Sequence, residues 1–312
     1  MAIAFHAGQI EVQTEANSRP AANMLAERLS VRGPRTISFY ETADLLVLAT
    51  PGAKGGLRFV SISGSEQPLL SVRDDGLLAL PDGVSILADG VQVGAIAINL
   101  QARRRARANG RVVVKEGRVL LDAAEELANC RKYMAPSVAL ESRLHQGPAA
   151  REAVEAGDAR LHAVLEGLET AFLASISPEG RPDVSHKGGP PGFMSFDAAA
   201  RVLSWPELIG NGMLKSAGNV RATGVVSVVA LDLESGDAYE LSGRGEYRTE
   251  LRYEEPRTSG LWPADTDFPT QGVMTVAVEE VTLLRHFVSP RRKVESAEKI
   301  TSCSPAEDQR PL

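Results

Sequence analysis

Most of the chain alternates between apolar and polar residues with the two-residue period of β-strands. Short turns rich in Gly or Asp separate these segments, for example at residues 51–56 and 73–76. In the first half the pattern predicts strands over residues 45–50, 57–63, 68–72, 77–80 and 91–99, and a further strand after the basic segment 102–110. Many short strands with Gly-rich turns and little helix predict a β-barrel with flanking helices.

Helical periodicity is confined to a few segments. In residues 21–29 the apolar Met24, Leu25 and Leu29 share one face, which predicts a leader helix packed on the first barrel. Residues 148–170 are rich in Glu and Ala and predict a helical stretch that opens a second barrel. The long polar segment over residues 248–271 is expected to be a lid or an interface arm. A final strand is predicted over residues 273–284, and a poorly ordered tail from residue 289 onward.

The second half of the chain repeats the order of the first. Landmarks recur after roughly 125 to 130 residues, the length of one domain. The proposed pairs are Val60-Ser61 with Val184-Ser185, Gly64 with Gly188, Leu80-Pro81 with Trp205-Pro206, Gly94 with Gly224, and Asn109-Gly110-Arg111 with Ser242-Gly243-Arg244. This predicts a tandem duplication, with a first split-barrel-like domain and its leader helix over residues 1–147, a second barrel over 148–290 and a polar tail over 291–312.

The candidate chemistry is concentrated in the second half. A strand, a Pro-Glu-Gly turn and a returning strand lead into the run Val-Ser-His-Lys-Gly-Gly-Pro-Pro-Gly-Phe at 184–193. Polar donors followed by backbone without bulky side chains suit a phosphate or another anion. The turn Gly-Asn-Gly at 210–212 then enters a short helix, and the N-terminus of a helix also favours an anion.

These two motifs are similar to those of the pyridoxamine 5'-phosphate oxidase-like family of FMN-binding split β-barrels, over about residues 160–250. In relatives, FMN lies between the two barrels of a homodimer, so the resemblance implies an internal interface here, with a further homodimer as a possible partner. His186 is the candidate catalytic residue. The resemblance implies cofactor binding by Ser185, His186, Lys187, Gly188, Trp205, Asn211, Gly212, Lys215, Ser216 and Asn219.

The first half lacks the matching residues. In the alignment above, Ile62-Ser63 stand where the second half has His186-Lys187, and Glu66 falls within the segment that replaces the Gly-Pro-Pro-Gly run. A carboxylate there would repel a phosphate. We therefore expect a degenerate first barrel that supports a functional second one.

Composition narrows the function further. The chain has 312 residues, a net charge of -6 and a pI near 5.5, which disfavours nucleic acid and anionic membranes as partners. The N-terminus does not resemble a signal peptide and no apolar run is long enough to cross a bilayer. The two cysteines lie far apart without metal-ligand spacing, which favours a reducing cytoplasmic setting and no metal site. Cys130, in a segment Asn-Cys-x-Lys-Tyr seen in longer family members, is either a reactive thiol or an inert buried residue.

The leading hypothesis is an FMN-dependent oxidoreductase acting on a small organic substrate, with NAD(P)H as a possible electron donor. The chain shows no Ser-His-Asp order and no paired carboxylates, and flavin chemistry needs little from side chains because the cofactor carries the hydride. One alternative is a haem-binding protein with His186 or His286 as the axial ligand. Another is a non-catalytic flavin-binding or interaction module.

Overall fold

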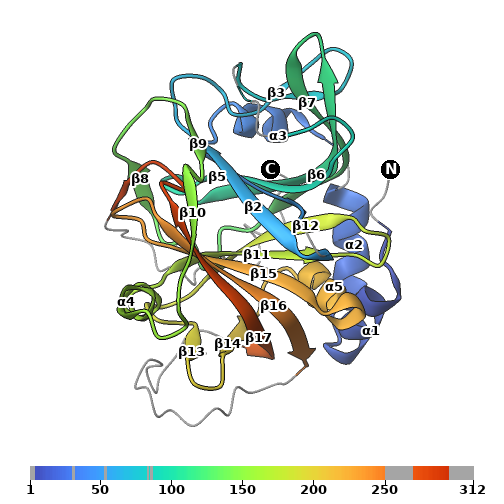
Figure 1. The fold of residues 1–312 in the computed structure, drawn as a ribbon. Helices are drawn as coiled ribbons and strands as arrows, with labels where there is room; N and C mark the ends of the chain where they lie inside the picture. The colour runs from blue at the N-terminus through green and yellow to red at the C-terminus, as the bar shows by residue number, and fades with distance from the viewer. Residues whose placement is uncertain are drawn as a thin grey trace.

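Two antiparallel β-sheets lie against each other in the computed structural model, which describes residues 4–29, 32–52, 55–82, 84, 87–249 and 270–294 (Figure 1). The first sheet contains β1 (Leu45–Pro51), β2 (Leu57–Ser63), β3 (Ser71–Val72), β4 (Leu78–Ala79), β5 (Gln92–Asn99), β6 (Arg104–Lys115), β7 (Arg118–Asn129) and β9 (His145–Gly147). The second contains β10 (Ala150–Ala153), β11 (Thr170–Ile176), β12 (Pro182–Gly188), β13 (Ser195–Asp197), β14 (Val202–Leu208), β15 (Val225–Leu231), β16 (Ala238–Arg248) and β17 (Thr270–Arg285).

The order of the strands confirms the tandem duplication. The first sheet runs β3-β4-β7-β6-β5-β1-β2, and the second runs β13-β14-β17-β16-β15-β11-β12. Each strand of the first series has its counterpart at the same place in the second. The chain is therefore two split β-barrels in tandem, as the alternation and the repeated landmarks predict.

A shared irregularity marks the equivalence most clearly. The pairing register shifts between Asn109 and Gly110 in β6, and between Ser242 and Gly243 in β16. Both glycines lie against a neighbouring strand, since a Cβ would stand 1.9 Å from the Asp122 carbonyl oxygen at Gly110 and 2.0 Å from that of Ala277 at Gly243. The predicted match of these two segments is confirmed, and glycine is required at both bulges because only hydrogen fits there.

Three other landmark pairs are wrong: Ser61 with Ser185, Gly64 with Gly188, and Gly94 with Gly224. The counterpart of Gly188 is Ser63, because the two hairpins pair Leu45 with Ser63 and Thr170 with Gly188. In the hairpin of each barrel, Ser61 pairs with Val47 and His186 pairs with Phe172, and both sites lie on the face that meets the other barrel. Ser61 is thus the counterpart of His186 and not of Ser185, because a shift of one residue turns a side chain to the opposite face. Gly94 lies inside β5, whereas Gly224 ends a helix, so these glycines do not correspond.

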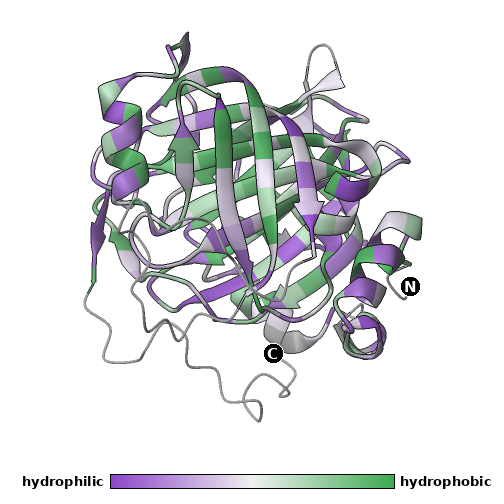
Figure 2. Cartoon of the chain, turned by 90° about the horizontal axis from the view of Figure 1, so that it is seen from below, coloured by the Kyte–Doolittle hydropathy of each residue, from purple (hydrophilic) through white to green (hydrophobic). Residues whose placement is uncertain are grey.

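The apolar strands at the centre are buried on both faces, which accounts for their unbroken hydrophobic runs. In β1, Leu46 and Leu48 point into the core of the first barrel, whereas Leu45, Val47 and Ala49 point into a third core shared with the second barrel. The same alternation in β11 sends Leu173 inward and Phe172 to the shared core. Figure 2 shows this apolar centre with polar residues toward the outside. The shared core fixes the two barrels against each other.

The helices lie at several places around the two sheets (Figure 1). They are α1 (Ala7–Glu15), α2 (Arg19–Leu29), α3 (Pro34–Tyr40), α4 (Ala159–Glu166) and α5 (Lys215–Thr223). The helix predicted over residues 21–29 is α2, which contacts β7 of the first barrel as expected. Helix α1, which was not predicted, packs on α5 of the second barrel (Figure 1). A Cβ on Gly218 would lie 2.4 Å from Cα of Gln9, which shows how closely these two helices approach.

Two helical predictions need correction. The predicted face of α2 is wrong at Met24, which is 45% exposed, because the helix buries Ala22 and Ala26 instead. The predicted helical stretch 148–170 begins with strand β10 and only then forms α4. None of the helices in the described part is long and apolar enough to span a membrane.

The C-terminal segment returns to the first half. Strand β18 (Arg291–Lys293) pairs with β8 (Ser137–Ala139), and the guanidinium of Arg291, 1% exposed, donates to Ser137 and to Asp44. The predicted disorder from residue 289 onward is therefore wrong as far as residue 294. The rest of the tail with Cys303, and most of the predicted lid, lie outside the described residues.

Candidate functional site

A pocket of about 110 Å³ opens where the two barrels meet, and both contribute to its wall. Nine of the ten residues predicted to bind a cofactor line it, all except Asn219. They come from strand β12, strand β14 and the turn into α5. The structure therefore brings together residues that are separated by up to about thirty positions in the sequence.

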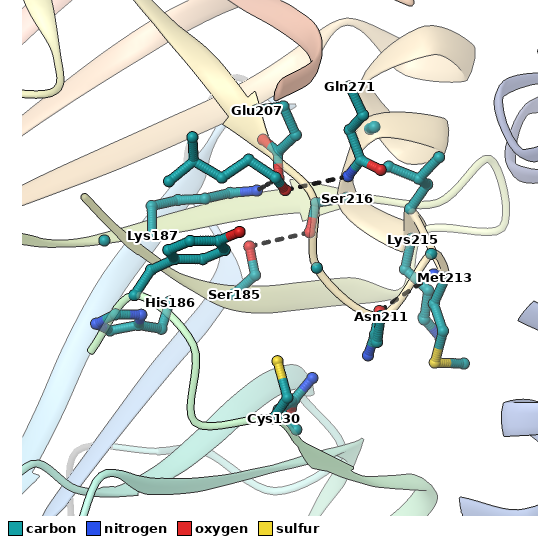
Figure 3. Close-up of a pocket in the computed structure, with 18 of the residues that line it drawn as sticks. Cys130, Ser185, His186, Lys187, Glu207, Asn211, Met213, Lys215, Ser216 and Gln271 are labelled. Atoms are coloured by element: carbon teal, nitrogen blue, oxygen red, sulfur yellow. Dashed lines mark hydrogen bonds and ion pairs between the residues drawn. The ribbon is translucent and has the colours of Figure 1, made fainter. Parts of the chain in front are cut away.

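The first wall is the end of β12. Ser185 and His186 are nearly buried, at 3% and 7% exposure, and point to opposite faces of the strand. The hydroxyl of Ser185 lies 3.1 Å from that of Ser216 (Figure 3). The Ser216 hydroxyl also donates to the carboxylate of Asp183 at 3.1 Å. This chain of hydrogen bonds joins the strand to helix α5 on the floor of the pocket.

The second wall is the N-terminus of α5. Leu214 precedes the helix in the left-handed conformation, with φ 47°, and no side chain caps the first turn. The Asn211 side chain instead accepts from the Met213 backbone at 3.1 Å, and Gly212 permits the turn with φ +76°. Because the first N–H groups of an α-helix have no partner inside the helix, this end favours an anion.

The third wall comes from the first barrel, and the sequence did not reveal it. Arg105 and Arg107 of β6 reach the pocket, together with Leu127, Asn129, Cys130 and Tyr133 at the end of β7. Cys130 is a free, half-buried thiol that faces the site from the side opposite Ser185 (Figure 3). A signal was present, because Arg105 and Arg107 are two residues apart in one strand and therefore share one face.

Charge in the pocket is predominantly positive. The described residues that line it include four cations, Arg105, Arg107, Lys187 and Lys215, and one carboxylate, Glu207. Lys187 pairs with Glu207 at 2.5 Å, and Lys215 pairs at 2.5 Å with Glu125 behind the wall. Both lysines are thus held in place by carboxylates, and an incoming anion competes with these pairs.

His186 is a neutral imidazole. Burial lowers its pKa well below the ordinary value, and the positive charges of Arg105 and Lys187 lower this pKa further. Its ring stands edge-on to Phe172, with centroids 5.8 Å apart, and the guanidinium of Arg105 contacts its Nδ1 atom. The ring is therefore fixed from both barrels.

Asn219 does not belong to this pocket. Its side chain accepts from Gln9 at 3.0 Å, lies 2.8 Å from His6 Nε2 and donates to Ser175 at 3.0 Å. It lines a separate hollow of about 200 Å³ beside the start of α1. These contacts link α1 to α5, so Asn219 lies apart from the other nine residues predicted to bind a cofactor.

The equivalent place in the first barrel lacks this chemistry. Ser61 and Ile62 take the positions of His186 and Lys187. In β16 of the second sheet, Glu240 pairs with Val229. The equivalent pair in the first sheet is Arg107 with Ile96, so Glu240 takes the position of Arg107. Glu240 is 3% exposed and forms an ion pair with Arg151. A buried carboxylate in place of an arginine makes this second place unsuitable for an anion.

The polar atoms left over in the pocket test whether a flavin phosphate and ring fit. Among the described side chains, several buried atoms that line the pocket have no hydrogen-bond partner: His186 Nε2, Trp205 Nε1, Arg107 Nε, Asn129 Oδ1 and Glu207 Oε2. Buried polar groups are normally paired, so unpaired donors and acceptors around one cavity indicate a polar ligand. Trp205, 1% exposed, belongs to the barrel core and also borders the pocket. This set suits an anionic, hydrogen-bonding heteroaromatic group.

Comparison with known proteins gives likeness in structure only. No known family profile matches the chain, and no curated protein matches it. HupZ of Group A Streptococcus is 17% identical, with 40% of this chain and 90% of that chain covered and a TM-score of 0.32. A protein described as a putative pyridoxamine 5'-phosphate oxidase from Lactobacillus delbrueckii is 22% identical, covering 40% and 91%, with a TM-score of 0.29. One described as an F420 reductase is 20% identical, covering 38% and 94%, with a TM-score of 0.27.

Each of these structures is matched over at least nine-tenths of its own length but over only about two-fifths of this chain. In its fold, the chain is two split β-barrels in tandem, as the order of its strands shows.

Proposed function

We propose that this protein binds FMN in the pocket between its barrels and acts as a flavin-dependent oxidoreductase on a small organic substrate. The observation that carries the proposal is the meeting of four cations with the uncapped N-terminus of α5 around a cavity that also holds unpaired buried polar atoms. Phosphate groups bind where positive side chains and free backbone N–H groups converge. Similar structures with names of oxidase and reductase type support the same class of activity.

In this proposal the phosphate end is held by Lys187, Ser185, Ser216 and the first turn of α5. Arg107, anchored to Asp183 at 3.1 Å, supports this end from the first barrel. Trp205 and His186 border the place for the ring. A bound flavin would supply hydride or electron transfer, with NAD(P)H as a possible donor, while the chain binds, orients and excludes water.

The first experiment is an absorbance spectrum of the purified protein, followed by titration with FMN under flavin-fluorescence detection. The variant Lys187→Ala/Ser216→Ala should weaken FMN binding by at least about 100-fold, since hydrogen bonds to charged groups contribute about 1.5–3 kcal/mol each. The matched control is Lys293→Ala/Ser177→Ala, which removes the same groups outside the pocket. Unchanged FMN affinity in the pocket variant would remove the site assignment.

The haem alternative has two candidate axial ligands, His186 and His286, and the structure distinguishes between them. His286 is exposed and is not among the pocket-lining residues, so it cannot serve this site. Only His186 lies in the pocket wall. A Soret band after adding haemin would bring this alternative forward, and a protein that takes up neither FMN nor haemin would support the non-catalytic interaction module.

A further inference from the structure

The contact between Arg105 and His186 crosses the interface between the two barrels. Arg105 belongs to β6, His186 to β12, and the guanidinium nitrogen of Arg105 lies against Nδ1 of the imidazole. A guanidinium is always protonated and carries five N–H donors but no acceptor. Nδ1 must therefore accept the hydrogen bond, and it can do so only without a proton of its own.

The surroundings keep the ring in this state. The second terminal nitrogen of Arg105 donates to the Lys132 carbonyl at 3.3 Å, which holds the guanidinium from the first barrel. The ring is 7% exposed, and the next residue along the strand is a lysine. A second positive charge on the imidazole is therefore unfavourable, and a neutral ring with unprotonated Nδ1 carries its proton on Nε2.

The Nε2 atom is the ring nitrogen that lacks a hydrogen-bond partner within the described part of the chain, and it is buried. His186 lines the pocket. A buried N–H without a partner is costly, so the site gains when a ligand brings an acceptor atom to it.

We propose that Arg105 is a positioning residue that fixes His186 as the neutral Nε2–H tautomer, so that the pocket offers its ligand a hydrogen-bond donor and not a metal-binding nitrogen. The ligand class follows: a molecule with a carbonyl oxygen or an unprotonated ring nitrogen at this point. An oxidised flavin satisfies this requirement, and to that extent the inference rests on the proposed function.

The same tautomer argues against haem ligation by His186. A metal-ligating histidine binds through the lone pair of one nitrogen, and its other nitrogen donates an N–H to an acceptor. In His186 this arrangement is reversed, because Nδ1 accepts a hydrogen bond from Arg105 and does not donate one. Ligation through Nε2 would require the ring to lose its Nε2 proton or Arg105 to withdraw.

Nuclear magnetic resonance tests the tautomer without any ligand. In protein labelled with ¹⁵N-histidine, long-range proton–nitrogen spectra distinguish protonated from unprotonated ring nitrogens, and His186→Gln identifies the signal. We expect Nε2 protonated and Nδ1 unprotonated at neutral pH in the wild type. A wild-type ring with the proton on Nδ1, or on both nitrogens, would overturn the proposal.

The role of Arg105 needs its own variant. Arg105→Met should abolish the strong preference for the Nε2–H form, whereas Arg104→Met, on the neighbouring position where the side chain packs over Phe39 instead, should leave it unchanged. An unaltered tautomer in Arg105→Met would refute the positioning role. Haemin adds a second readout: the wild type should show no Soret change that depends on His186, and such a change would contradict the inference.

Titration with FMN links the tautomer to binding. His186→Leu should weaken FMN binding about tenfold, the usual effect of losing one hydrogen bond, whereas His186→Gln, which keeps an amide donor, should lose less. Equal loss in both variants would overturn the donor role. If the wild type binds no FMN at all, the proposed function fails, and the tautomer measurement still decides the inference about Arg105.

Discussion

The backbone of Gly188 lies directly against the carbonyl oxygen of Tyr133, and a Cβ on Gly188 would stand 1.8 Å from that oxygen. Gly188 ends the strand that carries the candidate phosphate ligands, and Tyr133 follows the last long strand of the first barrel. The glycine was predicted as part of a loop that approaches a cofactor. Its closest neighbour is instead the backbone of the other half of the molecule.

Gly188→Ala should therefore destabilise the protein by about 1–3 kcal/mol, the usual cost of forcing extra volume into a packed region. Urea denaturation measures this difference. Gly157→Ala is the matched control, because a Cβ there meets nothing within 4 Å and should change stability by less than about 0.5 kcal/mol. Equal stability of the two variants would show that Tyr133 can move away from Gly188.

Glu207→Gln should tighten FMN binding. Glu207 is the single carboxylate among the described residues that line the pocket, and it pairs with Lys187 at 2.5 Å. Removing its charge frees the lysine for the phosphate, and we expect about three- to tenfold higher affinity in a fluorescence titration. Glu246→Gln, an exposed change outside the pocket, should leave the affinity unchanged. Weaker binding in Glu207→Gln would mean that this carboxylate contacts the ligand itself.

One chain should bind one FMN. The equivalent place beside β2 of the first barrel has Ile62 where the second barrel has Lys187. Glu240, which meets β2 from the second barrel by accepting from the Phe59 backbone, is buried and pairs with Arg151. Isothermal titration should therefore reach saturation at one equivalent per chain. Two equivalents of similar affinity would show that the first barrel retains a site.

The stability of the protein should depend on pH through His186. Its folded pKa lies well below the ordinary value of 6.5, so the unfolded chain binds a proton that the folded protein excludes as the pH falls below 6.5. The stabilising contribution is complete above that pH and is lost on acidification, by up to about 1.4 kcal/mol per pH unit. Urea denaturation between pH 7.5 and 5 should show a smaller loss for His186→Gln than for the wild type. The control His286→Gln removes an exposed imidazole and should follow the wild type.

Local patterns were sufficient to predict much of the fold. Strand β2 has the predicted bounds, Leu57–Ser63, and the Pro-Glu-Gly turn joins β11 to β12 with Gly180 at φ +78°. Both predictions depend on residues close together in sequence, where alternation and turn chemistry are decisive. The bulges at Gly110 and Gly243 also carried a visible signal, since both follow a short polar residue in a long strand.

Contacts between distant segments could not be predicted in this way. Helix α1 packs on α5 because Gly8 and Gly218 allow the two backbones to meet, and the sequence around neither glycine indicates its partner. The arginines of β6 reach a pocket formed by residues about eighty positions later. The sequence pattern identified nine residues of the second barrel that line the pocket, but not the wall that the first barrel supplies.

The two halves have exchanged their ends. Helix α1, from the start of the chain, covers the second barrel, and β18, near the end of the chain, pairs with β8 and buries Arg291 against Asp44 of the first half. A chain cut near residue 148 would give two fragments that each lack a piece held by the other. In an ordinary dimer any subunit can meet any other, whereas here every half keeps one permanent partner. Because the two halves are held together in one chain, the contact between Arg105 and His186 needs to form only once. The first half has to carry only the arginine, and the second half only the histidine.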